Sequence, residues 1–67
     1  MKNYIKDIRR SMNMSQEQLA VTCGVTRQTI NAIENDKYDP TLSLAFKLSI
    51  SLQTTVDKLF VFKEDAN

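Results

Sequence analysis

The sequence predicts an all-α fold, and three observations carry this prediction. Hydrophobic residues make up 42% of the 67 residues, enough for a compact core, and charged residues make up 25%, as on ordinary globular surfaces. There is only one glycine and one proline. Alternating runs typical of strands are few, whereas apolar residues recur at helical spacing. A chain this short is expected to form one domain over residues 1–67.

The first helix is expected at residues 4–12, with Asn3 as its cap. Ile5, Ile8 and Met12 recur at helical spacing within a polar segment. This spacing gives the helix one apolar face.

A second helix is expected to begin at Gln16. Ser15 and Gln18 have the spacing of a capping box, in which each side chain bonds the other's free backbone N–H. The helix should end at Gly24, because glycine adopts a left-handed conformation without steric cost. Its core-facing residues are expected to be Leu19, Ala20 and Cys23.

A third helix is expected over residues 27–35, capped by Thr26. Ile30 and Ile33 should face the core. The outward face should then carry Arg27, Gln28, Asn31 and Ala32.

Residues 35–40 have turn composition, and Thr41 has the character of a cap for a fourth helix at residues 42–52. Thr55 is expected to cap a last short helix through Val56, Leu59 and Phe60. After it, residues 61–63 are expected to extend as a short strand, and residues 64–67 to fray.

Residues 16–35 therefore form two short helices joined by a glycine turn, the arrangement that places the second helix in the DNA major groove. Arginine can bridge guanine O6 and N7, and glutamine or asparagine can bridge adenine N6 and N7. The net charge of +1 is small, but residues 1–38 carry six basic and four acidic groups, a balance of +2. We expect double-stranded DNA to be the partner.

The sequence resembles the lambda repressor/Cro (XRE-type) family of small DNA-binding regulators. The resemblance lies in SQEQLA at residues 15–20 and GVTRQTINAIEN at 24–35, and it continues through KYDPTL at 37–42, LAFKL at 44–48 and VDKLF at 56–60. It implies a five-helix bundle that binds operator DNA, commonly as a homodimer.

The resemblance also implies roles for individual residues. Gln16 would contact phosphate and orient its helix, and Arg9 and Glu34 would form a partly buried salt bridge. The recognition positions would be Thr26, Arg27, Gln28, Thr29 and Asn31, and the backbone-contacting loop would contain Asn35, Lys37 and Tyr38.

Two residues depart from the family pattern. Gln53 stands where the family usually has glycine between the last two helices, so the turn there is expected to be altered or strained. Asp36 also replaces a common glycine and adds a negative charge beside the phosphate-contacting loop.

A dimer interface is predicted at the C-terminal end, around Phe60, Val61 and Phe62. Three consecutive large apolar side chains cannot all face one small core, because successive side chains point in different directions. At least one should remain exposed and mark an interaction surface. The alternative is that Phe62 folds back over the first helix and covers the core of the monomer.

No catalytic, metal or cofactor site is predicted. The single cysteine, Cys23, lies on an apolar stripe and is interpreted as a core residue, and there is no histidine. Glu34 lacks a second carboxylate or a histidine for acid–base chemistry. No apolar run approaches the ~20 residues that span a bilayer, and no signal peptide is recognisable. A soluble cytoplasmic protein without a small-molecule ligand domain is expected.

The leading hypothesis is a repressor that binds a two-fold symmetric operator as a homodimer. An antitoxin or protein-binding adaptor with autoregulatory DNA binding is the alternative, but such proteins generally need a longer partner-wrapping segment than the seven residues after Phe60. A purely structural helical module would not need arginine, glutamine and asparagine on one face.

Overall fold

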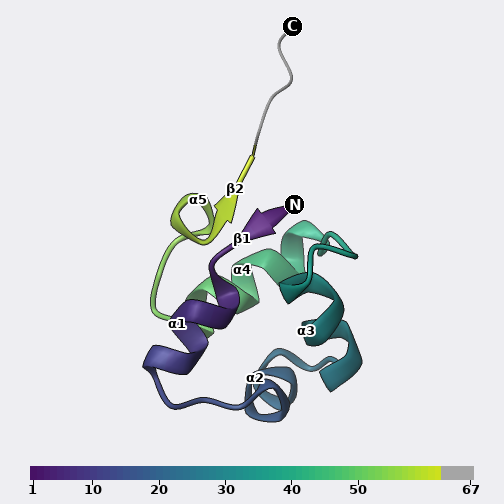
Figure 1. Ribbon diagram of the computed structural model, residues 1–67, viewed down its shortest axis with the longest axis vertical. Helices are drawn as coiled ribbons and strands as arrows, with labels where there is room; N and C mark the ends of the chain where they lie inside the picture. The colour runs from purple at the N-terminus through teal and green to yellow at the C-terminus, as the bar shows by residue number, and fades with distance from the viewer. Residues whose placement is uncertain (63–67) are drawn as a thin grey trace, which may run out of the picture.

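The computed structural model describes residues 1–62 as five helices and a two-stranded sheet (Figure 1). The elements in chain order are β1 (Lys2–Asn3), α1 (Ile5–Ser11), α2 (Gln16–Cys23), α3 (Arg27–Glu34), α4 (Leu42–Ser51), α5 (Val56–Leu59) and β2 (Phe60–Val61). The predicted all-α, five-helix architecture with a short C-terminal strand is confirmed. The tail expected to fray, residues 64–67, lies outside the described residues, as does Lys63.

Helix caps of the expected type begin three of the helices. The Ser15 and Gln18 side chains form the complete capping box of α2, while Thr26 and Thr41 accept from the third backbone N–H of α3 and α4. Thr55 occupies the cap position of α5 but makes no side-chain cap bond. Three of these four predicted caps therefore satisfy backbone donors at helix starts.

The prediction that Asn3 caps the first helix is wrong in position. The N-cap of α1 is Tyr4, which makes no side-chain cap bond, and the helix spans Ile5–Ser11. Asn3 instead lies in β1, where its Oδ1 accepts from the Ile5 N–H at 3.1 Å and its Nδ2 donates to the Ile33 carbonyl at 2.8 Å. A tertiary contact with the end of α3 thus determines the position of Asn3.

Four helices end in the same hydrogen-bonded turn. After α1, α2, α3 and α4, one residue with positive φ is followed by a backbone N–H that bonds back to a carbonyl five positions earlier, the Schellman pattern. The left-handed residues are Asn13, Gly24, Asp36 and Gln53. Gln53, with φ of 57°, therefore keeps the turn that glycine would form, at the steric cost of a Cβ atom.

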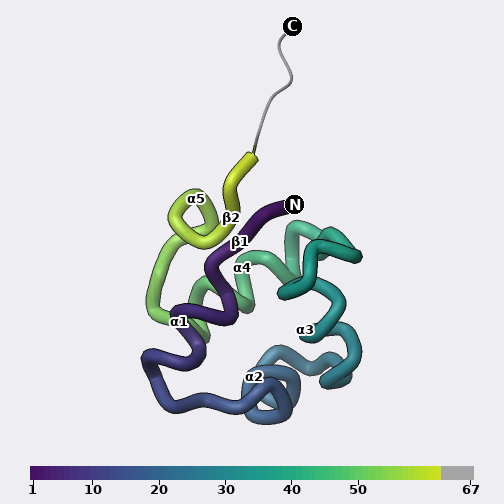
Figure 2. Tube along the Cα trace, in the orientation of Figure 1, coloured from purple at the N-terminus to yellow at the C-terminus, as the bar shows by residue number. Residues whose placement is uncertain are grey.

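The short strand after α5 is confirmed but begins one residue earlier than expected, and its partner is the N-terminal strand β1. The two pair antiparallel, with Lys2 opposite Val61 and Asn3 opposite Phe60. Figure 2 shows the N-terminal segment lying beside the last described residues, at the end of the molecule opposite α2. Pairing of the two ends holds α5 against the bundle.

The core lies between the helices and consists mostly of inward-facing helical residues, joined by Phe60 of β2. Fully buried side chains come from every helix: Ile5, Leu19, Ile30, Ile33, Leu48, Leu52 and Leu59. Cys23 is buried among them, as expected, and its Sγ lies 3.6 Å from the Ser51 hydroxyl. This core holds α3 in a fixed position against α2.

We predict that Gln53→Gly raises the free energy of unfolding by about 0.5–1 kcal/mol, because it removes a Cβ from a left-handed residue while adding some freedom to the unfolded chain. Gly24→Ala should lower it by about 1 kcal/mol; no atom lies within 4 Å of the added Cβ, so the loss reports the backbone alone. Urea unfolding measures both. Gln53→Ala is the control, and an equal gain from it would contradict this explanation.

Candidate nucleic-acid interface

Residues 16–34 form a helix–turn–helix unit from α2 and α3. Gly24 ends α2 with φ of 72°, and the Val25 N–H bonds back to the Ala20 carbonyl at 3.0 Å. Ala20 itself is almost fully buried, as expected for a small residue where two helices pack closely. The turn therefore redirects the chain within three residues and lets α3 begin at Arg27.

A buried ion pair joins α1 to the end of α3. Arg9 Nε donates to Glu34 Oε2 at 2.6 Å, and Arg9 Nη2 donates to Oε1 at 3.2 Å. The two side chains are only 8% and 1% exposed. Arg9 Nη1 also donates to the Met14 carbonyl at 2.8 Å, so the guanidinium holds the α1–α2 connection as well.

Gln16 completes this cluster from the first turn of α2. Its Nε2 donates to Glu34 Oε1 at 2.9 Å. The Glu34 carboxylate thus receives hydrogen bonds from α1 and α2 and connects three helices at one point. This hydrogen bond joins the first turn of α2 to the end of α3 and uses one of the two N–H groups of the Gln16 amide.

Arg27 and Gln28 occupy the first two positions of α3. Both side chains are exposed, and neither makes a hydrogen bond or ion pair with another residue in the 1–62 range. As far as the described residues go, their donors and acceptors are therefore available to a ligand. Arginine and glutamine are among the side chains that read guanine and adenine edges.

The other predicted recognition residues make side-chain hydrogen bonds within or next to α3. Thr26 Oγ1 lies 3.1 Å from Thr29 Oγ1 and also caps α3 by accepting from the Thr29 N–H. Asn35 Nδ2 donates to both the carbonyl and the Oδ1 of Asn31, at 2.9 and 3.2 Å. The first pair brackets Arg27 and Gln28 at the start of α3, and the second lies at its end.

The loop after α3 exposes Lys37 and Tyr38. The Lys37 N–H bonds to the Ala32 carbonyl at 2.8 Å, so the loop backbone continues directly from the end of the helix. Asp36, the departure from the family pattern, adopts φ of 63° and is ion-paired with the Met1 amine. This ion pair offsets the negative charge that Asp36 adds beside Lys37.

The predicted interface residues at the C-terminal end have different environments. Phe60 is buried and Val61 half-buried, whereas Phe62 is 72% exposed. The expectation that at least one of the three remains outside is confirmed. The alternative in which Phe62 covers the core is wrong, because its ring is largely open to solvent.

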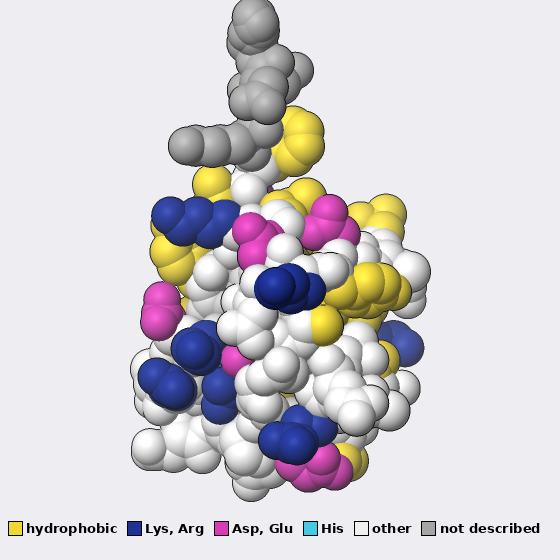
Figure 3. All heavy atoms as spheres, turned by 45° about the vertical axis from the view of Figure 1, so that its right-hand side comes forward, with side chains coloured by type: hydrophobic (Ala, Val, Ile, Leu, Met, Phe, Trp, Pro, Cys, Tyr) yellow, Lys and Arg dark blue, Asp and Glu magenta, His cyan; other side chains and the backbone are white. Residues whose placement is uncertain are grey.

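The face of the molecule in Figure 3 is more apolar toward one end. In Figure 3, hydrophobic side chains gather in the upper half, near β1, β2 and α5, and the lower half, near α2, is mostly polar with basic and acidic groups interspersed. Among residues 1–62, no group of three or more histidine, cysteine, aspartate or glutamate residues could hold a metal ion. No described helix has the length and apolar character needed to cross a membrane.

Comparisons with known proteins agree with this geometry. The helix-turn-helix family model matches residues 5–59. An uncharacterized HTH-type transcriptional regulator of Methanocaldococcus jannaschii is 46% identical over 65 residues, covering 97% of this chain and 98% of that one. The control protein C.SmaI of Serratia marcescens is 38% identical over 55 residues, covering 82% of this chain and 66% of that one.

A solved structure has the same fold. The restriction-modification controller protein C.AhdI from Aeromonas hydrophila superposes with a TM-score of 0.78 at 27% identity, covering 84% of this chain and 85% of that chain. The similarity extends over nearly the whole described part of the chain.

We predict that Arg9→Met lowers the free energy of unfolding by about 3 kcal/mol, because it leaves the Glu34 carboxylate buried without its cation. Arg10→Met, at the exposed neighbouring position, is the control and should change stability by less than about 0.5 kcal/mol. A double-mutant cycle of Arg9→Met and Glu34→Gln, followed by urea unfolding, measures the coupling. Additive changes would show that the pair is not coupled.

Proposed function

The chain belongs to the helix-turn-helix family of transcriptional regulators, and on that premise we propose that it is a repressor binding a two-fold symmetric operator as a homodimer. Residues 1–67 are proposed to act as one DNA-binding domain in the cytoplasm. The names of its relatives support action by binding rather than by catalysis.

The observation that carries this proposal is the pair of unoccupied side chains at the start of α3. Arg27 and Gln28 lie where the recognition helix of a helix-turn-helix unit enters the major groove, since its N-terminal residues contact base edges. We assign them direct base contacts. Thr26, Thr29 and Asn31 are proposed to flank this surface and to limit how α3 sits in the groove.

Phosphate contacts are proposed for the residues around the recognition helix. Asn35, Lys37 and Tyr38 follow α3 and are exposed, and Gln16 lies at the N-terminus of α2, where backbone N–H groups favour an anion. The net charge of +1 is small, so electrostatic attraction to any DNA sequence should be weak. Specificity would then come mainly from the base contacts.

Two copies are needed to read a symmetric operator. Recognition helices of a dimer must enter successive major grooves, which are roughly 34 Å apart along the DNA. We place the contact between copies at the C-terminal end around Phe60, Val61 and Phe62, because this end lies away from α2. A dimer bound to the operator would block or reposition RNA polymerase.

Selection of bound sequences from a random DNA pool tests the proposal directly. We expect recovery of a sequence with dyad symmetry. Recovery of no preferred sequence would exclude sequence-specific binding, and an asymmetric site would exclude the two-fold arrangement.

Arg27→Ala and Gln28→Ala should each weaken binding to the selected site by about 1–3 kcal/mol while leaving the fold intact. Arg27→Lys is the matched variant, because lysine keeps the charge but loses the bidentate geometry. It should retain non-specific affinity and lose discrimination at one base pair. Affinity for the selected site is measured at constant salt. If both alanine variants bind as tightly as the parent, Arg27 and Gln28 do not contact bases.

Lys37→Ala should weaken binding to all sequences alike and reduce the slope of log affinity against log salt by about 1, as expected on losing one phosphate contact. Lys58→Ala on α5, far along the chain from the helix-turn-helix unit, is the control and should leave the slope unchanged. An unchanged slope in Lys37→Ala would rule out the phosphate contact.

Phe62→Glu should lower the mass of the protein in solution at micromolar concentration from that of two copies to that of one, because it places a charge in an apolar contact. Phe62→Leu keeps the apolar character and should remain dimeric. Sedimentation equilibrium measures both. A Phe62→Glu protein that stays fully dimeric would show that Phe62 lies outside the interface.

A further inference from the structure

Helix α4 carries an apolar stripe that the fold leaves open to solvent. Leu42, Phe46 and Ile50 follow one another at four-residue intervals and are 70%, 52% and 74% exposed. Residues spaced by four lie on one side of a helix. The opposite side of α4 is part of the core through Leu44 and Leu48, so the helix is apolar on two sides.

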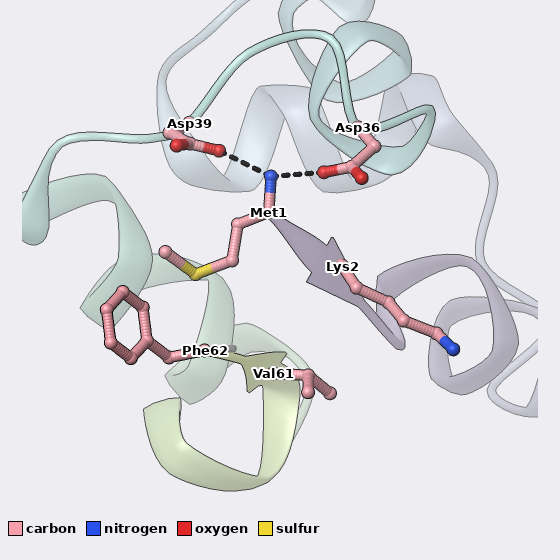
Figure 4. Close-up of a pocket in the computed structure, with 6 residues that line it drawn as sticks. All are labelled: Met1, Lys2, Asp36, Asp39, Val61 and Phe62. Atoms are coloured by element: carbon pink, nitrogen blue, oxygen red, sulfur yellow. Dashed lines mark hydrogen bonds and ion pairs between the residues drawn. The ribbon is translucent and has the colours of Figure 1, made fainter. Parts of the chain in front are cut away.

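The stripe continues into two hollows at the end of the molecule. One hollow, of about 260 Å³, is lined by Leu42 together with Pro40, Val56, Phe60 and Met1. The second is lined by Met1, Val61 and Phe62, with the charged residues Lys2, Asp36 and Asp39 on its rim (Figure 4). Met1 and Asp39 line both hollows, so apolar side chains continue from Leu42 at the start of the stripe to Phe62, around the charged Met1 amine and Asp39.

The Met1 amine fills the polar side of this region. It donates to Asp39 Oδ1 at 2.7 Å and is ion-paired with Asp36. The hydrogen bond to Asp36, followed by that to Asp39, raises the pKa of the amine above its ordinary value. The two carboxylates share one cation, and Lys2, which lines the same hollow, supplies the second positive charge, so the charges around this hollow balance.

The apolar residues of the stripe are spaced symmetrically about Phe46. Phe46 lies four residues, about 6 Å, from both Leu42 and Ile50, and near the middle of the ten-residue helix. Turning a second α4 by 180° about an axis through Phe46 places Leu42 opposite Ile50 and Phe46 opposite Phe46. A two-fold interface requires this self-complementarity, because it uses the same patch on both copies.

Other occupants fit this surface less well. DNA phosphate would find only Lys47 as a cation on α4. A membrane surface favours a helix with a basic polar face, whereas the face of α4 opposite the stripe is occupied by the core. A second copy of the chain supplies an apolar surface of the same shape, and it is the partner that a two-fold operator already requires.

We infer that Leu42, Phe46 and Ile50 form the centre of the homodimer interface, with α4 packed antiparallel against α4 of the second copy and Phe62 at the edge. This inference rests on the homodimer of the proposed function and specifies its surface. It extends the contact proposed at the C-terminal end along α4.

The test uses the full chain and sedimentation equilibrium at micromolar concentration. Leu42→Lys and Ile50→Glu should each weaken dimerisation by about tenfold or more, because each buries an unpaired charge in an apolar contact. The double variant Leu42→Lys/Ile50→Glu should regain much of the dimer, because antiparallel packing puts each lysine opposite a glutamate of the second copy. Circular dichroism checks that all variants keep the helical content of the parent.

Val21→Glu is the matched control. Val21 is 69% exposed on α2 and is β-branched like Ile50, but it lies outside the stripe. It should leave the mass of the parent unchanged.

Three results would overturn the inference. If Ile50→Glu remains dimeric while Phe62→Glu dissociates, the homodimer stands but its centre lies at the C-terminal end. If both single variants dissociate and the double variant does not recover, the antiparallel pairing is wrong. If the parent is monomeric, both the inference and the homodimer fail, while selection of DNA sequences still tests DNA binding independently.

Discussion

The buried carboxylate of Glu34 is the constraint on which the rest of the interface depends. It stands at the last position of the recognition helix α3 and accepts hydrogen bonds from Arg9 of α1 and Gln16 of α2. A charge this deeply buried is tolerated only when its partners are in place. The three helices therefore have one relative arrangement that satisfies it, and α3 cannot rotate about its own axis without stranding the charge.

Fixing the end of α3 also fixes its beginning, because a helix of eight residues is too short to bend appreciably. At that beginning, Thr26 and Thr29 bond each other, and at the other end Asn31 and Asn35 do the same. Among residues 26–29, only Arg27 and Gln28 make no side-chain hydrogen bond with another residue of the 1–62 range. Rigid neighbours hold the backbone of these two residues in place. Less conformational entropy would therefore be lost when they bind a ligand.

Much of this could be predicted from the sequence, because the signals are local. Capping residues such as Ser15 and Thr26 and the spacing of apolar residues define the helices α2, α3 and α4. The N-terminal strand was missed, because a two-residue strand carries no periodic pattern and forms only when the distant Phe60 arrives beside it. The contact of Gln16 with Glu34 depends likewise on tertiary packing. The resemblance implied that Gln16 orients its helix, but it did not indicate the partner.

The exposed stripe of α4 shows a different limit. Helical spacing predicted the inward residues of α2 and α3 correctly. On α4, Leu42, Phe46 and Ile50 are as apolar as the core residues, so hydrophobicity alone does not tell which side of the helix faces inward. Packing against α2 decides it. Because α4 contacts α2 on one side and carries the stripe on another, a second copy bound to the stripe would set the position of α2, and through Glu34 that of α3. The distance between the two α3 helices of a dimer would then be set by helix packing alone. No flexible linker would lie between the dimer interface on α4 and the helix that enters the DNA major groove.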